Sequence, residues 1–271
     1  MKKSSAFMLI CAALLLCTAL VSAGCITTAA TENTAASGDT PLLGFVGALS
    51  DETELILSDM QNKEEKSIGI FKFTKGTCQG IPCVVGTCGV GKIYSAACTQ
   101  AMIDLYHPAN IVNIGVGGAL NADLRVGDLV IAEETVIHDF DETPLGNEPG
   151  QLWENKLIYI PCDEKLIAAA KNAAKNLDIP TKTGITATGD QFIEEPEDKL
   201  RLEKDYNALV CDMEGAAVTL VCYENGVPCV VCRTISDTRD GDSDEYEANV
   251  DAIGEKIAKL GEELLLCLAA E

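Results

Sequence analysis

Short apolar segments alternate with segments of helical periodicity from residue 42 to the C-terminus. The apolar segments predict strands at 42–49, 68–74, 81–87, 110–116, 128–137, 182–189, 207–212 and 228–236. The periodic segments predict helices at roughly 92–106, 163–177, 196–205, 214–225 and 246–269. Because nearly continuous apolar strands are buried on both faces, helices should cover both sides of one sheet. The pattern predicts an α/β fold, a three-layer α/β/α sandwich with a central mixed, mostly parallel sheet.

The N-terminal segment has a different pattern from the rest of the chain. Two lysines at positions 2 and 3 precede an apolar run at 6–21 and small residues at 22–24, as in a secretory signal peptide. The run is short for a membrane span, which needs about 20 apolar residues. We expect residues 1–23 to be a signal peptide, with two alternatives: a lipoprotein signal that places lipid on Cys25, or an uncleaved anchor.

Residues 26–40, ITTAATENTAASGDT, lack apolar periodicity and predict a flexible tether. The folded domain is expected at 41–271. The chain is therefore predicted to be exported to the cell envelope or beyond, with a membrane tether through its N-terminus if Cys25 is lipidated.

Charge and composition exclude some partners. The chain has 42 acidic and 20 basic residues and a formal net charge of -22, so nucleic-acid backbones and anionic membranes are poor partners for its surface. Aromatic residues make up only 5%, which also argues against a surface that stacks nucleic-acid bases.

Thirteen cysteines are many for this length, and export would permit disulfides. Most are expected to be small buried apolar residues. Cys229 and Cys232 lie within one apolar strand and should point to opposite faces, unlike a redox pair at a helix start. Cys78 and Cys83 flank a Gly80-Ile81-Pro82 turn and are the best candidates for a disulfide.

Two glycine-rich turns follow predicted strands. In VVGTCGVGKI, Gly86, Gly91 and Lys92 fit part of a P-loop, but Ile93 stands where a hydroxyl should hold magnesium, so a turn that lines a pocket is favoured. GVGGAL (115–120) lacks the last glycine of a dinucleotide fingerprint, although its glycines would let backbone amides approach a ligand closely.

A metal site is not expected. His138, Asp139 and Asp141 lie together in HDFDET, but one histidine and two carboxylates on a polar loop are more often solvated than bound to metal.

Acidic residues follow three apolar strands, in GALSDETEL (47–55), CDMEGAAV (211–218) and TISDTRD (234–240). Each acid alone could be a cap or turn residue. Because open α/β sheets bind ligands at the carboxyl edge of their strands, three such ends, together with TGDQFIEE (188–195), indicate a binding site.

Six motifs in order along the chain resemble the nucleoside phosphorylase superfamily: GALSDETEL, GVGGALNADLRVGDLVIAEE, HDFDET, TGDQFI, CDMEGAAV and RTISD. Within it, the chain is most similar to the methylthioadenosine/S-adenosylhomocysteine nucleosidases, over about residues 42–268. The resemblance implies a nucleoside phosphorylase-like fold, a homodimer and no metal or organic cofactor.

The resemblance also implies roles at the sugar and the scissile bond. Asp237 would be the general acid that protonates N7 of adenine, and Glu52 would position and activate the attacking water. Glu214 would bind the ribose hydroxyls, and Met213 would pack against the sugar.

On the purine side, the resemblance implies that Phe192 stacks on the base and that Ile193 presents backbone groups to its edge. Val116, Gly117 and Ser236 complete the predicted substrate-binding residues.

These roles agree with the chemistry of N-glycosidic cleavage, which needs a neutral leaving base and a stabilised oxocarbenium-like sugar. An acid near the base and a carboxylate near the water meet both needs, as in inverting glycosidases. Since the acid must hold a proton near neutral pH, Asp237 should be desolvated or close to another carboxylate. The chain departs from the family pattern at Asp212, where glutamate is usual, and in GVGGAL, where G-x-A-G-G-L is usual.

We therefore predict a hydrolytic nucleosidase that releases adenine from 5'-methylthioadenosine, S-adenosylhomocysteine or related 5'-substituted adenosines. The alternatives are a phosphate-dependent phosphorylase and an exported, non-catalytic nucleoside-binding or storage protein. Water is favoured over phosphate as the acceptor because no arginine precedes Arg125, whereas the early loop holds Asp51, Glu52 and Glu54.

Overall fold

The computed structural model describes residues 40–270 of the chain. The predicted signal peptide, Cys25 and the tether as far as residue 39 lie outside the described residues, so the expectations for them stay predictions.

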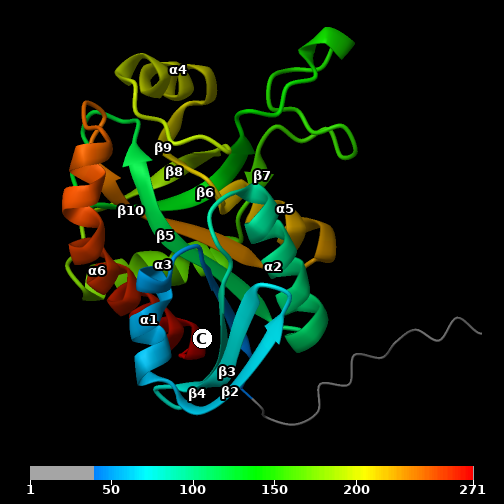
Figure 1. The fold of residues 1–271 in the computed structure, drawn as a ribbon, viewed down its shortest axis with the longest axis vertical. Coiled ribbons are helices and arrows are strands. Elements are labelled where there is room, and N and C mark those ends of the chain that lie inside the picture. The colour runs from blue at the N-terminus through cyan, green and yellow to red at the C-terminus, as the bar shows by residue number, and fades with distance from the viewer. Residues whose placement is uncertain (1–39, 271) are drawn as a thin grey trace, which may run out of the picture. The chain divides into compact units, whose positions relative to one another are not determined.

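Helices lie on both sides of one mixed β-sheet (Figure 1). The strands are β1 (Leu43–Gly47), β2 (Gln61–Ile68), β3 (Phe71–Cys78), β4 (Ile81–Thr87), β5 (Asn110–Ala119), β6 (Leu129–Ile137), β7 (Ile160–Pro161), β8 (Thr181–Thr188), β9 (Ala208–Asp212) and β10 (Cys229–Asp237). The helices are α1 (Ser50–Asp59), α2 (Lys92–Tyr106), α3 (Glu164–Asn176), α4 (Pro196–Tyr206), α5 (Gly215–Asn225) and α6 (Ser243–Ala269), with a 3-10 turn at Thr143–Leu145.

The predicted three-layer α/β/α arrangement is confirmed. Helices α1 and α3 both pack against α6 on one face of the sheet, and α2 packs against α5 on the other. Helix α4 contacts β8 and β9, above the edge at which the candidate site lies. No helix among the described residues combines the length and the apolar character that crossing a bilayer requires.

The sheet curves back on itself. Its strand order is β10-β6-β8-β9-β5-β1-β4-β3-β2, and β10 also pairs with β5. Strands β1 and β10 both run parallel to β5, so all three end at the same edge. Strand β9 joins this edge because Cys211, near its end, pairs with Gly118 of β5. The curvature thus brings the ends of β1, β5, β9 and β10 together.

Two elements were not predicted. Helix α1 directly follows β1, where the sequence indicated only an acidic loop, and its apolar positions are few. All eight residues of β2 are exposed, so it carries no apolar signal. The predicted strand at 68–74 is confirmed only from Phe71, where β3 begins, because residues 69–70 form the turn between β2 and β3, in which Gly69 adopts a φ of 57°.

The nine cysteines that are buried in the described domain are reduced. The predicted Cys78–Cys83 disulfide is therefore wrong. Across β3 and β4, Cys78 pairs with Ile81 and Cys83 with Gly76. The two cysteines are thus diagonal neighbours, which lie about 7 Å apart, whereas a disulfide needs Cβ atoms about 4 Å apart.

The other expectation for cysteines holds. Cys229 packs in the apolar cluster that includes α2 and α5, and Cys232 packs in the one that includes α3 and α6. The CxxC pair therefore lies on opposite faces of β10, as predicted.

Candidate active site

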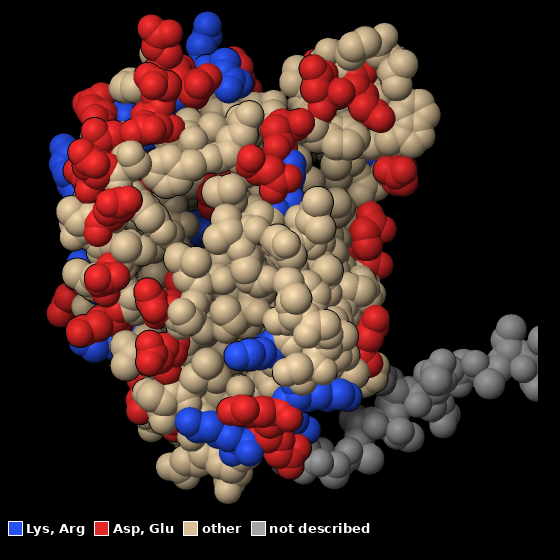
Figure 2. All heavy atoms as spheres, in the orientation of Figure 1, with Lys and Arg blue, Asp and Glu red and all other residues tan. Residues whose placement is uncertain are grey.

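A pocket opens at the edge where β1, β5, β9 and β10 end. Its empty volume is about 700 Å³, which suits a small-molecule ligand, and it is open to solvent on one side. In Figure 2 a hollow on this face reveals acidic and basic atoms below the surface. All nine predicted site residues line the pocket: Glu52, Val116, Gly117, Phe192, Ile193, Met213, Glu214, Ser236 and Asp237. The sheet thus brings together residues that are far apart in sequence.

Glu52 lies in the first turn of α1 and is 4% exposed. Its Oε2 atom accepts hydrogen bonds from the backbone N–H groups of Ala48 (2.6 Å) and Leu49 (3.0 Å), and Oε1 accepts one from Val116 (3.2 Å). Burial raises the pKa of the Glu52 carboxyl, and these N–H groups and the charge of Arg233 oppose the rise. A helix start and a strand end therefore fix the carboxylate at the pocket wall.

The glycine turn of β5 makes room for two carboxylates. A Cβ atom on Gly115 would lie 2.8 Å from Oε1 of Glu52, and one on Gly118 would lie 2.9 Å from Oδ2 of Asp237. Because such contacts are too short for carbon, only glycine lets β5 pass between these side chains. The glycines thus let the backbone of β5 lie close to the Glu52 and Asp237 carboxylates. The sequence predicted such a close backbone approach for a ligand.

Asp237 ends β10 and is 2% exposed. Its Oδ1 accepts a hydrogen bond from the Ser236 hydroxyl at 2.8 Å, and its Oδ2 accepts one from Nζ of Lys199 at 2.7 Å. The carboxyl is desolvated, as expected, but its charged partner is a lysine rather than another carboxylate. The Ser236 hydroxyl also lies 3.2 Å from the Gly117 carbonyl oxygen, so this side chain orients Asp237.

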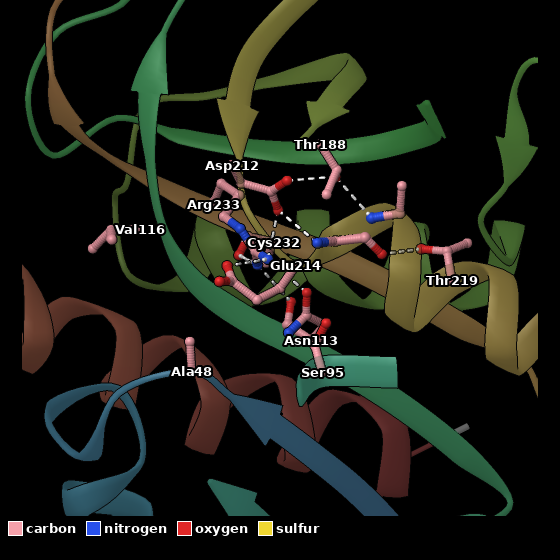
Figure 3. A network of polar contacts seen from close by, with 12 residues as sticks. Ala48, Ser95, Asn113, Val116, Thr188, Asp212, Glu214, Thr219, Cys232 and Arg233 are labelled. Carbon is pink, nitrogen blue, oxygen red and sulfur yellow. Dashed lines mark hydrogen bonds and ion pairs between the residues drawn. The ribbon is translucent and has the colours of Figure 1, made fainter. Parts of the chain in front are cut away.

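Behind the pocket, Arg233 of β10 joins the acidic pair of the CDMEG segment (Figure 3). Its Nη2 lies 2.6 Å from Oδ2 of Asp212 and 4.0 Å from Oε2 of Glu214, and it donates to Oδ1 of Asn113 at 2.6 Å. The Asp212 carboxylate also accepts hydrogen bonds from the Gly215 N–H and the Thr188 hydroxyl. Asp212, the departure from the family pattern, thus forms a buried ion pair with Arg233.

Glu214 faces the pocket from the start of α5, where its Oε1 accepts a hydrogen bond from the Gly91 N–H at 2.8 Å. Burial and the neighbouring Asp212 carboxylate raise the pKa of Glu214 to about 7, although Arg233 and the Gly91 N–H oppose the rise. Glu214 therefore changes charge close to neutral pH.

The P-loop-like segment before α2 binds the Glu214 carboxylate through a backbone N–H group. Gly91 has a φ of 101°, a backbone conformation that favours glycine. Its N–H donates a hydrogen bond to the Glu214 carboxylate. The Lys92 ammonium pairs with Asp139 and lies 3.6 Å from Asp190, so its charge is already compensated. The turn before α2 therefore lines the pocket, as the sequence favoured.

The predicted purine-side residues lie on one side of the pocket. Phe192 is 47% exposed and packs edge-to-face on Tyr246, with ring centroids 5.5 Å apart, while Ile193 is buried. Gln191 of the TGDQFI motif, Cys211 of the CDMEGAAV motif and Tyr246 of α6 also line the pocket, although none of them was predicted as a site residue. Burial raises the pKa of the Cys211 thiol to about 12, so this thiol is neutral at physiological pH.

Within residues 40–270, no group of three or more histidine, cysteine or acidic side chains is arranged to hold a metal ion. Asp139 of HDFDET instead accepts from Lys92 and from the Asp190 N–H. Among the residues that line the pocket, none is a lysine or arginine.

Lys199 and Arg233 were missed as site residues. Lys199 lies among acids in EEPEDKLRL, a segment with the pattern of a solvated helix face. Arg233 belongs to the RTISD motif, where a charged residue inside an apolar strand was a usable signal of a buried ion pair.

Comparison with known proteins identifies the family. The family model described as "Phosphorylase superfamily" matches residues 42–266. The chain belongs to the phosphorylase superfamily. Among members of the superfamily, a 5'-methylthioadenosine/S-adenosylhomocysteine nucleosidase of Shewanella halifaxensis is 37% identical over 210 residues, which cover 75% of this chain and 91% of the relative. The nucleosidase of the same name from Halalkalibacterium halodurans is 37% identical over 196 residues, covering 72% and 84%.

Solved structures of superfamily members share the fold. The 5'-methylthioadenosine/S-adenosylhomocysteine nucleosidase of Neisseria meningitidis, in complex with methylthio-immucillin-A, matches with a TM-score of 0.79 and 29% identity over 83% of this chain and 98% of that one. Futalosine hydrolase of Helicobacter pylori also matches with a TM-score of 0.79, at 32% identity over 83% and 97%. The nucleoside phosphorylase-like fold is therefore confirmed.

Proposed function

We propose that this protein is a hydrolytic nucleosidase that cleaves the N-glycosidic bond of 5'-substituted adenosines and releases adenine. The observation that carries the proposal is a pair of buried carboxylates, Glu52 and Asp237, in one pocket that lacks lysine and arginine in its lining. The names of the relatives support 5'-methylthioadenosine and S-adenosylhomocysteine as the substrates.

Asp237 acts at the leaving base. As the bond between C1' and N9 breaks, its electron pair moves into the purine, and N7 becomes basic enough to take a proton from the Asp237 carboxyl. Phe192 and Ile193 hold the purine, and the Ser236 hydroxyl fixes the orientation of the carboxyl.

Glu52 and Glu214 act at the sugar. Glu52 accepts a proton from the water that attacks C1', and three backbone N–H groups hold it in place while it does so. Glu214 accepts hydrogen bonds from the ribose hydroxyls, and its negative charge favours the positive charge that develops on the ring. Met213, Val116 and Gly117 form the apolar surroundings of the sugar.

Water is the acceptor in this proposal. A phosphorylase needs cationic groups that bind an anionic nucleophile, and arginine is the favoured residue for that task. The four arginines of the chain are engaged elsewhere: Arg233 with Asp212, Arg239 with Glu203, Arg201 with Asp198, and Arg125 with backbone carbonyls. The Lys92 ammonium is held by Asp139.

The test is adenine release from 5'-methylthioadenosine by purified residues 41–271, first in phosphate-free buffer and then with phosphate added. We expect equal rates and a free 5-methylthioribose product. Turnover that requires phosphate and yields a sugar 1-phosphate would show a phosphorylase, and tight binding without turnover would show a nucleoside-binding protein.

We also propose that the protein is a homodimer. Apolar side chains at the pocket rim and the start of α2 are exposed, namely Val90 (46%), Tyr94 (48%) and Ile93 (79%). Figure 2 shows charged residues around this face but few in its middle, over α2 and α5. Because large uncharged patches mark interaction sites, a second copy that covers this patch would also close the pocket.

Export is proposed on the sequence alone, from the lysine pair, the apolar run and the tether that precede the domain. Intact-mass measurement of the protein from its native host should find residues 1–23 removed. An added lipid mass on Cys25 would identify the lipoprotein form, and a cytoplasmic product that starts at Met1 would refute export.

A further inference from the structure

Lys199, on α4, is fully buried beside the proposed general acid. Its Nζ atom lies 2.7 Å from Oδ2 of Asp237 and 2.9 Å from each of the carbonyl oxygens of Thr238 and Gly241. Lysine is rarely buried completely, and when it is, its ammonium has partners. Here it has three, and one of them is the carboxyl that the reaction uses.

The three partners fit two protonation states of the lysine. An ammonium group has three N–H donors, one for each acceptor. A neutral amine has two N–H donors and one lone pair, so it could still donate to both carbonyls while it accepts a hydrogen bond from a protonated Asp237. One proton can therefore lie on either side of the 2.7 Å contact without leaving a buried polar atom unpaired.

We propose that Lys199 stores the proton that Asp237 delivers to the purine. In the resting protein the pair is an ammonium and a carboxylate. As the C1'–N9 bond breaks, a proton passes from Nζ to the Asp237 carboxyl, and the carboxyl gives a proton to N7. Adenine leaves as the neutral base, Asp237 is again a carboxylate, and the neutral Lys199 amine recovers a proton from solvent after product release. Lys199 is thus a positioning residue that acts through Asp237, and its role rests on the proposed function of that acid.

The Cys211 thiol of β9 and the Tyr246 phenol of α6 lie near the pair and stay neutral near neutral pH. The acidic groups nearby are the Glu52 and Glu214 carboxyls of the same pocket and the Glu245 carboxyl, which accepts a hydrogen bond from the Thr238 N–H. Burial raises the pKa of the Cys211 thiol to about 12, and it also raises the pKa of the Tyr246 hydroxyl above its usual value of 10.0. Neither the thiol nor the phenol therefore adds a charge beside the pair near neutral pH.

The experiment compares Lys199→Met and Lys199→Arg with Lys204→Met, a control at an exposed position of the same helix. Each variant is assayed from pH 5 to 10 on two substrates, 5'-methylthioadenosine and the 4-nitrophenyl 5-methylthioriboside. Adenine needs a proton to leave, whereas 4-nitrophenolate does not. Damage to the fold or to sugar binding would slow both substrates, and loss of the proton store would slow only adenine release.

We expect Lys199→Met to lower kcat for adenine release by about 10²-fold at pH 8, with little change in nitrophenolate release. The ratio of nitrophenolate release to adenine release should rise by the same factor, because Asp237 then has no ammonium group beside it to supply its proton. Lys199→Arg should be equally slow, since a guanidinium keeps its charge and does not give up its proton. Lys204→Met should behave as the wild type.

The proposal is overturned if Lys199→Met keeps the wild-type rate of adenine release, if Lys199→Arg restores full adenine release, or if both leaving groups slow equally. If Lys199→Met does not fold, Lys199→Arg alone still decides between a proton store and a fixed positive charge. Asp237→Asn separates this proposal from the proposed function. If adenine release is unaffected in Asp237→Asn, Asp237 is not the general acid, and the proposed function of this residue fails whatever the lysine variants show.

Discussion

At the scale of the residue, the two proposed catalytic carboxyls are held by different kinds of donor. Asp237 is bound by side chains, a serine hydroxyl and a lysine ammonium, whereas Glu52 is bound by backbone N–H groups. Side-chain donors can exchange protons with the acid, and backbone donors cannot. The arrangement agrees with one group that delivers a proton and another that receives it.

Asp237→Asn should lower kcat for adenine release by about 10²- to 10⁴-fold, because the amide cannot protonate N7. Steady-state kinetics on 5'-methylthioadenosine measure the loss. Asp240→Asn, at an exposed position of the following loop, is the control. A near-normal rate in Asp237→Asn would remove this residue from its assigned role.

Glu52→Gln should cost a similar factor, because the amide cannot take a proton from the attacking water. Glu54→Gln changes an exposed position of the same helix and should leave the rate intact. Equal rates for the two variants would contradict the assignment of Glu52. Circular dichroism spectra should be the same for both variants.

The raised pKa of Glu214 should give pH opposite effects on activity and on stability. In the proposed mechanism it binds the sugar as a carboxylate, so kcat/KM should fall as the pH drops through about 7, its raised pKa. The same raised pKa means that the folded protein binds this proton more tightly than the unfolded chain does. The stability that protonated Glu214 contributes is therefore present below its ordinary pKa of 4.5 and is lost as pH rises to about 7.

Both effects should be absent in Glu214→Gln, which does not titrate. Its pH–rate profile should lack the limb near pH 7. As the pH rises from 4.5 to 7, its unfolding free energy should increase relative to that of the wild type, because only the wild type loses the contribution of protonated Glu214. A wild-type profile that is flat from pH 5 to 8 would show that Glu214 does not act as a carboxylate.

At the scale of the element, Arg233 links three strands of the sheet. It connects β10 with Asn113 of β5 and with Asp212 of β9, and it is 1% exposed. Arg233→Met should therefore lower the unfolding free energy by about 3–5 kcal/mol, because Asp212 is left buried and unpaired. Denaturant unfolding measures the change in unfolding free energy. Arg201→Met is the control: it removes an exposed ion pair with Asp198 and should change the unfolding free energy by less than about 1 kcal/mol.

The sequence predicts elements well where burial leaves a pattern. The apolar strands β4, β5 and β10 and the helices α2 and α3 lie within a few residues of their predicted bounds. It does not predict β2, because an edge strand exposed on both faces has no alternation to detect. Nor does it predict that the sheet curves until β10 reaches both β5 and β6, since pairing is decided by packing between distant segments.

For the site, the motifs located all the predicted residues that line the pocket but not Lys199, which lies outside them. Glu214 and Asp237, which have roles in the proposed reaction, lie in the recognisable motifs CDMEGAAV and RTISD. Lys199 acts only through its contact with Asp237, and that contact depends on where α4 lies in space. Three-dimensional structure is therefore needed to find such supporting residues.

At the scale of the whole molecule, the proposed dimer makes the pocket depend on a second chain. Ile93→Glu should convert the dimer to a monomer, because it places a charge on a side chain that is 79% exposed in the single chain. Light scattering measures the mass, and kcat/KM should fall with it. Ile70→Glu, at a 67% exposed position on the β2–β3 turn, is the control and should remain dimeric. A wild-type protein that is monomeric at micromolar concentration would refute the dimer.

The buried thiols affect the whole molecule in another way. Burial raises the pKa of Cys83, Cys98, Cys211 and Cys232 to about 12, and thiolate is the form that oxidants and alkylating agents attack. The folded domain therefore protects its buried cysteines, whereas an unfolded chain exposes them at their ordinary reactivity. Each chain then has two competing fates in an oxidising medium, namely folding or the formation of non-native cross-links. Refolding yield should rise with added reductant, and once the domain has folded, withdrawal of the reductant should no longer matter.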